Sequence, residues 1–169
     1  MEYRITSKNQ ISAFRGLIAF TIFLIIGVWL VGISKGFKTD LFVFFGIFYI
    51  VNLIPVLFIH FQYYIANKNM IFTIELDKKQ FLFKTNGLSK TINFSEVQKV
   101  DIYMIPSMYR GSNFKMLPFE DYHYAILQTH NEILMVTSLL VKNLVKEFKN
   151  LGINMERHQC FYPYIKPRD

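Results

Sequence analysis

The sequence has little that points to covalent or catalytic chemistry. It contains one cysteine, Cys160, in 169 residues, so no disulfide can form within the chain. Motifs of the types G-x-x-x-x-G-K-[ST], G-x-G-x-x-G, H-E-x-x-H, G-x-S-x-G and C-x-x-C are missing, which removes support for phosphate-binding loops, zinc proteases, serine hydrolases and redox pairs. The histidines are scattered, and the adjacent acids Glu120 and Asp121 fit a solvated turn. We therefore expect no catalytic residues, no metal site and no cofactor.

Charged residues are also scarce. They make up 18% of the chain, whereas 52% is hydrophobic and 17% is aromatic, which is too apolar for a soluble domain of this length. This balance excludes the disordered, collagen-like and disulfide-rich classes. The net charge of +7 is dispersed and lacks the dense clusters of a nucleic-acid-binding protein. Because most of the apolar excess precedes residue 66, we predict a membrane part followed by a smaller water-soluble part.

Two uncharged stretches predict transmembrane helices. Residues 16–34 carry no charge and, at about 1.5 Å per residue, just cover a hydrocarbon core of roughly 30 Å. A second uncharged stretch occupies residues 41–67, and we predict a span over about 41–64. The linker is too short to hold a domain, so the spans should form an antiparallel hairpin. A cleaved signal peptide fits less well, because no small-residue cleavage site follows the first span.

The basic residues favour a topology with both termini in the cytoplasm. Three precede the first span, the linker holds Lys35 and Lys38, and three follow the second span. Asn52, Pro55 and His60 interrupt the second span. A hydrogen bond across the hairpin, a kink and a position near the interface explain these three residues better than a transport pathway does.

The remainder of the chain has the pattern of an antiparallel sheet. Alternating hydrophobic residues predict four strands, over 70–77, 80–85, 88–94 and 97–105. The dipeptide Asn86-Gly87 predicts a type I′ hairpin turn, because both residues tolerate a positive φ.

A loop, a hairpin and a helix are expected next. Residues 106–118 lie between two prolines and read as a long loop, with a short strand around 114–117. Residues 122–130 and 132–137 predict a second hairpin. Apolar residues at helical spacing over 140–151 predict a C-terminal helix, capped by Thr137 or Ser138 and stopped by Gly152.

The order of these elements resembles that of a pleckstrin-homology (PH)-like domain. The segment IELDKKQFLFKTNGLSKTINFSEVQKVDIY looks like its opening strands, and YHYAILQTHNEILMVTSLLVKNLVKEF looks like its closing hairpin and helix. With a membrane hairpin in front, the chain is similar to small bacterial membrane proteins that carry PH-like domains. The resemblance covers about residues 68–151. It implies an antiparallel six- or seven-stranded sheet or barrel capped by a C-terminal helix.

We therefore divide the chain into three parts. Residues 1–67 form an N-terminal tail and two transmembrane helices, residues 68–152 form the PH-like domain, and residues 153–169 form a tail that contains aromatic residues and proline. The resemblance further implies a non-enzymatic binding or scaffolding module in the bacterial inner membrane.

Three hypotheses for its function remain open. In the first, the module binds a protein partner, with candidate contacts at Tyr109, Phe114, Phe161, Tyr162 and Tyr164. In the second, it senses anionic lipid, with candidate contacts at Lys78, Lys79, Arg110, Lys115, Lys142, Lys146 and Lys149. The phosphoinositide-binding pattern of eukaryotic PH domains is incomplete here, because no arginine follows these first lysines. In the third, it is a membrane immunity protein against a toxin. Assembly into a homo-oligomer is compatible with all three.

Overall fold

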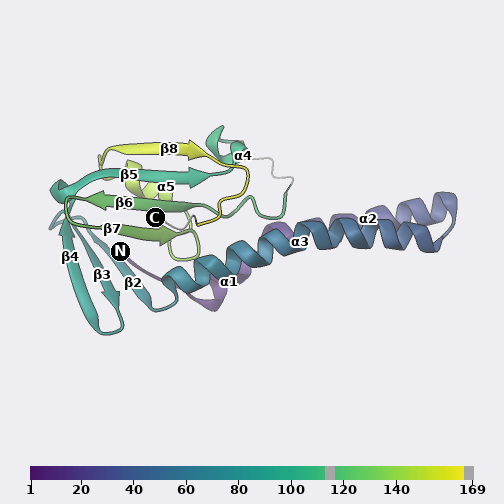
Figure 1. Cartoon of the computed structure of the whole chain (residues 1–169), viewed down its shortest axis with the longest axis horizontal. Coiled ribbons are helices and arrows are strands. Elements are labelled where there is room, and N and C mark those ends of the chain that lie inside the picture. Colours follow the sequence, from purple (N-terminus) through teal and green to yellow (C-terminus); the bar gives the residue numbers. More distant parts are fainter. Residues whose placement is uncertain (113–116, 166–169) are drawn as a thin grey trace.

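The computed structural model describes residues 1–112 and 117–165, and it has two parts (Figure 1). A helical hairpin projects from one side of a domain that consists mainly of strands. The elements in chain order are β1 (Glu2–Arg4), α1 (Ser7–Ala13), α2 (Arg15–Lys35), α3 (Thr39–Asn67), β2 (Met70–Glu75), β3 (Gln80–Thr85), β4 (Leu88–Asn93), the 3-10 helix η1 (Phe94–Glu96), β5 (Val97–Met104), α4 (Pro106–Tyr109), β6 (Tyr124–Thr129), β7 (Ile133–Thr137), α5 (Leu144–Lys149) and β8 (Met155–Gln159).

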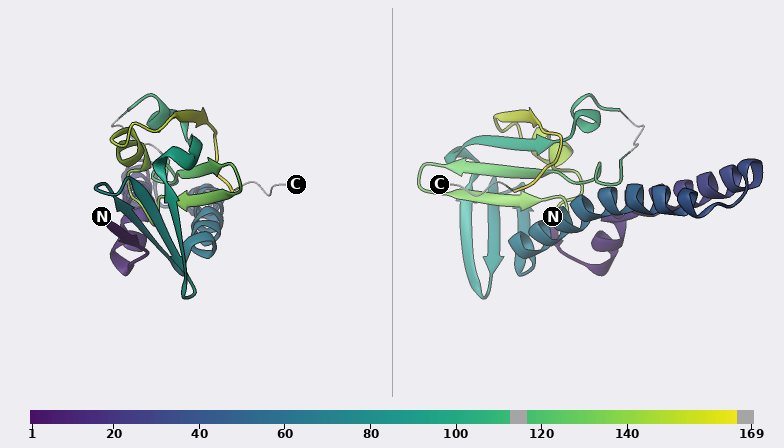
Figure 2. Two further views of the ribbon diagram at one scale, coloured as in Figure 1. Left: turned by 90° about the vertical axis from the view of Figure 1, so that its left-hand side faces the viewer. Right: turned by 45° about the vertical axis from the view of Figure 1, so that its right-hand side comes forward.

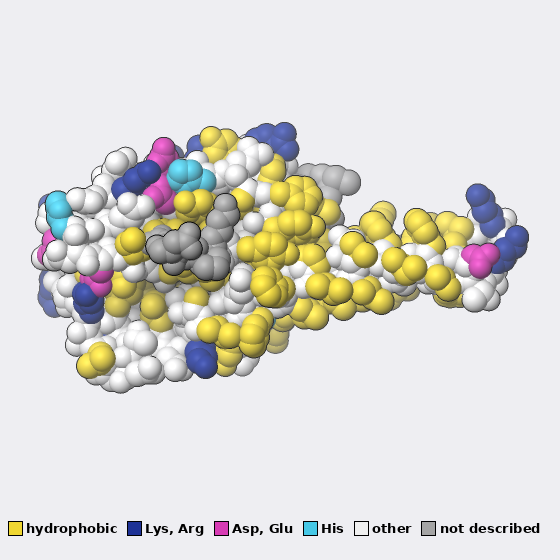
Figure 3. Space-filling model, viewed as in Figure 1, with side chains coloured by type: hydrophobic (Ala, Val, Ile, Leu, Met, Phe, Trp, Pro, Cys, Tyr) yellow, Lys and Arg dark blue, Asp and Glu magenta, His cyan; other side chains and the backbone are white. Residues whose placement is uncertain are grey.

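The helices of the hairpin, α2 and α3, are long and apolar enough to cross a membrane. Hydrophobic side chains cover most of the visible hairpin surface, and charged side chains gather at its tip (Figure 3). The Phe14 ring stacks on His60 at 4.3 Å, which fixes the start of α2 level with His60. The hydrogen bond expected from Asn52 across the hairpin is wrong: its Nδ2 donates to the carbonyl of Phe48, one turn earlier in the same helix, at 2.9 Å.

Helix α3 continues without a break from the hairpin into the domain. Its side chains Val56, Ile59 and Tyr63 are fully buried, in a cluster that also contains Tyr122 and Leu139. The helix therefore supplies part of the domain core in addition to the uncharged segment that it contributes to the hairpin. This continuity gives the domain a fixed orientation relative to the hairpin, because no flexible linker separates them.

The first sheet contains four antiparallel strands in the order β1-β2-β3-β4. Residues before the hairpin contribute the edge strand β1, whose Tyr3 lies opposite Phe72 of β2. The hairpin of α2 and α3 is thus inserted between two neighbouring strands of one sheet. The turn between β3 and β4 confirms the prediction for Asn86 and Gly87, which have φ of 50° and 83°.

The second sheet also contains four strands, in the order β7-β6-β5-β8. Strand β8 is parallel to β5, with Ile102 opposite Arg157. The strands of the two sheets cross at a steep angle, most clearly in the right-hand view of Figure 2. Such crossed sheets enclose a shared core. Its buried residues come from both sheets and from the segment around α5, and include Phe72, Phe81, Ile102, Leu127, Val136, Leu144 and Phe148.

Two parts of the expected architecture are wrong. The six- or seven-stranded sheet or barrel is replaced by two four-stranded sheets, because short strands at both ends of the chain join as β1 and β8. The long C-terminal helix is reduced to the six residues of α5, with Asn143 as its N-cap in place of Thr137 or Ser138. The apolar stripe is nevertheless buried: Leu140 and Val141 reach the core from a turn before the helix. A helix does not end the domain, since β8 follows it.

Candidate ligand site between the hairpin and the domain

The structure separates the lysines and arginines that were predicted to contact lipid. Lys78 and Lys79 lie in the β2–β3 turn, and the carbonyl of Lys79 accepts a hydrogen bond from Phe94 in η1, next to the start of β5. Strand β5 begins at the end of the domain farthest from the hairpin and runs toward it (Figure 1). Its 8 residues cover roughly 26 Å. Lys78 and Lys79 therefore lie far from the base of the hairpin, and Lys78 is paired with Glu75.

The other predicted basic residues lie elsewhere. Arg110 follows α4, which closes the end of β5 that faces the hairpin. Lys146 and Lys149 are exposed on α5, and Lys142 lies just before that helix. Lys115 falls outside the described residues. The seven candidates therefore do not form one basic surface.

The residues that were predicted to contact a protein also lie in separate places. Tyr109 is partly covered by the Arg157 guanidinium, which lies 5.3 Å from the ring centroid. Phe161, Tyr162 and Tyr164 follow β8 and lie against the base of the hairpin, where the Tyr164 ring meets Phe58 of α3 edge-to-face at 5.3 Å. Phe114 falls outside the described residues.

A cavity of about 940 Å³ lies between the first turns of the hairpin and the domain. Three segments that are distant in the sequence enclose it: β1 to the first half of α2, the chain between β5 and β6, and the turn that leads into α5. Its lining residues include Tyr3, Asn9, Arg15, Ala19, Phe20, Phe23, Asp121, His123, Ser138, Lys142 and Glu147.

The domain end of this cavity is polar and carries both signs of charge. Arg15 and Lys142 supply cations, and Asp121 and Glu147 supply carboxylates. Burial, followed by the negative charge of Glu147 and a hydrogen bond to it, raises the pKa of Tyr3 to about 12. The Tyr3 phenol therefore stays protonated at neutral pH.

The hairpin end of the cavity is apolar. Ala19, Phe20 and Phe23 line it from α2, within the uncharged stretch of that helix. One turn earlier, a Cβ on Gly16 would lie 2.9 Å from the carbonyl oxygen of Pro118, so glycine permits a close approach of these two backbones. The cavity thus changes from charged to apolar along the direction in which the hairpin leaves the domain.

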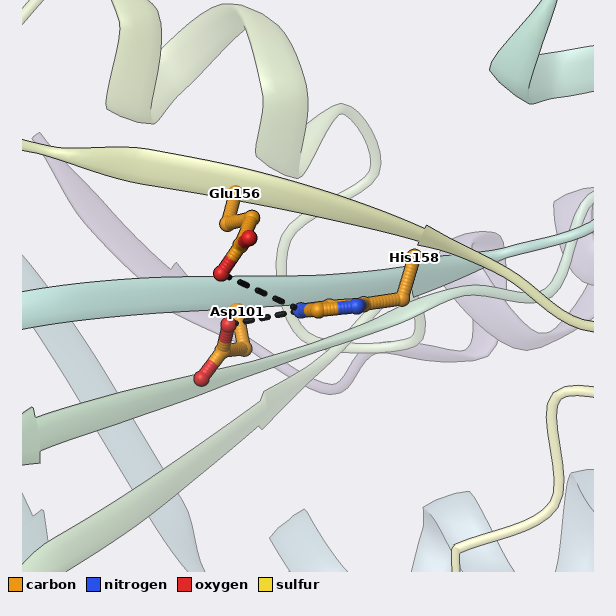
Figure 4. A group of neighbouring side chains, drawn as sticks. All are labelled: Asp101, Glu156 and His158. Atoms are coloured by element: carbon orange, nitrogen blue, oxygen red, sulfur yellow. Dashed lines mark hydrogen bonds and ion pairs between the residues drawn. The ribbon is translucent and has the colours of Figure 1, made fainter.

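A second polar cluster lies on β5 and β8, where Asp101, Glu156 and His158 point toward one another (Figure 4). Their ligand-type atoms lie within 4.8 Å of one another, a spacing that can hold a metal ion. The Lys99 ammonium, however, contacts Asp101 at 2.9 Å and also pairs with Glu156. Since this cation already pairs with both carboxylates, the group forms an ion-pair network that joins β8 to β5.

Buried Asp101 is the centre of this network. Its Oδ1 accepts from His158 Nε2 at 2.7 Å, and its Oδ2 accepts from Gln128 Nε2 at 2.6 Å. Burial alone raises the pKa of Asp101, but the hydrogen bonds and charges of His158 and Lys99 outweigh burial and leave the pKa lowered. The hydrogen bond to Glu156 and that to Asp101 raise the pKa of Lys99.

Among the charged residues of the cavity, the sequence predicts only Lys142 as a contact residue. It places Arg15 at the boundary of the first span and Asp121 in a solvated turn. No spacing in the sequence connects them with Tyr3 and Glu147, because the tertiary fold alone brings these segments together. Gly16 at the first turn of an apolar helix is the one local signal of a close approach.

Comparisons with known proteins identify the domain. A family model described as a PH domain matches residues 2–147, which is most of the chain. The match begins at β1 and ends within α5, so it includes strands on both sides of the hairpin. No curated protein and no solved structure matches the chain. The chain therefore belongs to the PH domain family.

Proposed function

We propose that this chain is a non-enzymatic binding module, integral to the membrane, whose PH domain holds a membrane phospholipid in the cavity at the base of the hairpin. The observation that carries the proposal is the lining of that cavity, which is charged where it meets the domain and apolar where it follows α2. A phospholipid has the same polarity along its length. PH domains generally bind proteins or lipids and have no catalytic activity, which agrees with a binding role.

The lengths of α2 and α3 support a membrane location for the cavity. Twenty residues of helix cover roughly 30 Å, the thickness of a hydrocarbon core. Counted from Lys35 this distance reaches Arg15, and counted from Asp40 it reaches His60. The Phe14–His60 contact places these two inner ends side by side. The cavity therefore lies at the boundary between hydrocarbon and headgroups, on the side that the basic residues predict to be cytoplasmic.

The charges of the cavity define the headgroup that fits it. Arg15 and Lys142 can bind the phosphate, and Asp121 and Glu147 favour a headgroup that also carries a positive charge. A zwitterionic phospholipid matches this balanced set better than a lipid with several negative charges. Lys78 and Lys79 add little, because their separation from the hairpin exceeds the Debye length of about 8 Å at physiological salt.

The test compares lipid retention by the purified full-length protein and its variants. In Lys142→Glu, the phospholipid measured by native mass spectrometry should fall on the order of tenfold, because each basic residue near a phosphate surface contributes about 1 kcal/mol. Lys149→Glu makes the same charge change on the exposed side of α5 and should retain lipid like the wild type. Equal retention by both variants would contradict the proposed site.

A second candidate function is the binding of a protein at the outer edge of β4. Strand β4 is the last strand of its sheet, and most of its side chains are exposed. Leu88 at its start is 79% exposed, which is unusual for a large apolar residue. An edge strand of this kind can pair with an extended segment of a partner. Photo-crosslinking from position 88 in cells tests this candidate, and no crosslinked partner is expected if the cavity is the only binding site.

A further inference from the structure

The C-terminal aromatic residues form a cluster against α3 at the base of the hairpin. The Tyr162 ring stacks on Tyr164 at 5.3 Å, and Phe119 packs against Tyr162 at 4.8 Å and Phe161 at 6.2 Å. Tyr164 in turn meets Phe58 of α3. We call these residues the aromatic collar: Phe58, Phe119, Phe161, Tyr162 and Tyr164.

Hydrogen bonds hold the collar at one level of α3. The Tyr63 hydroxyl donates to the carbonyl of Pro163 at 2.8 Å, and the backbone N–H of Ile165 donates to Gln62 Oε1 at 3.2 Å. The segment that carries the collar is therefore attached to residues 58–63 of α3. If the hydrocarbon core begins at Asp40, a thickness of about 30 Å along α3 ends at this level, near His60.

The collar also exposes apolar surface at that level. Phe161 is 61% exposed, and Phe58 is 51% exposed. On the outward side of α3 the exposed apolar surface continues past His60 through Phe61 to Ile65. Figure 3 shows hydrophobic side chains spreading without interruption from the hairpin onto the adjoining part of the domain. The collar is thus continuous with the apolar surface that the hairpin presents to the membrane.

We propose that the aromatic collar is a second membrane contact, which lies in the boundary layer between headgroups and acyl chains and fixes how the domain rests on the bilayer. Aromatic side chains with one polar atom favour this layer. The uncharged stretch of α3, residues 41–67, is about 40 Å long and so exceeds the hydrocarbon core by roughly 10 Å. That excess lies where the collar contacts the helix.

This inference rests on the proposed crossing of the membrane by α2 and α3, and it assigns to lipid three of the five residues that the sequence suggested for protein contacts: Phe161, Tyr162 and Tyr164. A protein partner would instead cover Phe161 and Tyr162 from the aqueous side. Fluorescence from single tryptophans distinguishes the two, because the chain contains one natural tryptophan, Trp29, inside α2.

The experiment uses the full chain in phospholipid nanodiscs. In a Trp29→Phe background, Phe161→Trp and Tyr162→Trp should be quenched more strongly by lipids with a doxyl group near the headgroup than by lipids with the group near the chain end. Both should be shielded from aqueous iodide. Leu88→Trp, on the exposed β3–β4 hairpin, is the matched control and should show the opposite pattern.

Wild-type Trp29 separates failure of the collar from failure of the hairpin. If Trp29 is quenched by lipid while positions 161 and 162 respond to iodide as position 88 does, the collar proposal is wrong and membrane insertion stands. Shielding of positions 161 and 162 from both quenchers would also overturn the proposal, because a protein surface would then cover them. If Trp29 itself is not quenched by lipid, the proposed crossing of the membrane fails as well.

Discussion

Asn67, the last residue of α3, should determine how firmly this helix is joined to the domain. Its side chain is 1% exposed. Its Oδ1 accepts from the backbone N–H of Thr137 at 2.9 Å, and its Nδ2 donates to the carbonyl of Met135 at 3.1 Å. The amide thus takes the place of a neighbouring strand along β7, an edge of the second sheet.

Asn67→Leu keeps the number and branching of the side-chain heavy atoms, but both hydrogen bonds are lost. A buried backbone group left without its partner costs about 1–3 kcal/mol, so two such groups predict a loss of roughly 2–6 kcal/mol in the free energy of unfolding. Denaturant unfolding of the full chain in nanodiscs measures this loss. Hydrogen exchange of β7 should show weaker protection of the Thr137 amide.

The control is Asn131→Leu, in the exposed turn between β6 and β7. It should change the free energy of unfolding by less than about 0.5 kcal/mol, as most surface substitutions do. If Asn67→Leu behaves like this control and the Thr137 amide stays protected, the proposed link between α3 and the second sheet is refuted.

Three further predictions concern the domain. Phe148→Ala should cost about 3–5 kcal/mol by denaturant unfolding, because the Phe148 ring is fully buried; a loss near zero would contradict its place in the core. Folding lowers the pKa of Asp101 from its ordinary value of 3.8, so the ionised side chain stabilises the fold above that value and loses this effect as the pH falls below it. In Asp101→Asn, the free energy of unfolding should therefore depend less on pH in an acid titration than it does in the wild type. A fragment of residues 68–169 lacks β1 and the buried residues of α3, so it should melt with lower cooperativity by circular dichroism than the full chain does; an equal melt would show that these parts add no stability.

The strands other than the two at the ends of the chain were predictable because their residues alternate. In β3, Phe81 and Phe83 are buried while Gln80 and Leu82 are less so, and the period of two follows from one face packing on the core. The same reasoning located β2, β4, β5, β6 and β7. A hydrophobic pattern identifies a strand where one face is covered by the core.

The two strands at the ends of the chain lack that signal. Strand β8, with the sequence MERHQ, is held by its pairing with β5, by the ion pair of Glu156 with Lys99 and by the hydrogen bond of His158 to Asp101, so its side chains show no apolar period. Strand β1 has three residues, too few to show any period. The cavity could not be predicted for a related reason: its charged and apolar residues come from segments that only the fold brings together.

The place of the hairpin within the fold connects the cavity with the membrane helices. Strands β1 and β2 are hydrogen-bonded neighbours, with Glu2 opposite Thr73 and Arg4 opposite Ile71. The chain leaves the sheet from β1, passes through α1, α2 and α3, and returns at β2, so one sheet fixes both ends of the insertion. Helix α3 is also held along its last turns by the domain core. Helix α2 has fewer such contacts, and it forms the apolar wall of the cavity. Under the proposed function, a phospholipid in the cavity would contact α2 and the domain at once, so lipid binding would be coupled to the position of α2.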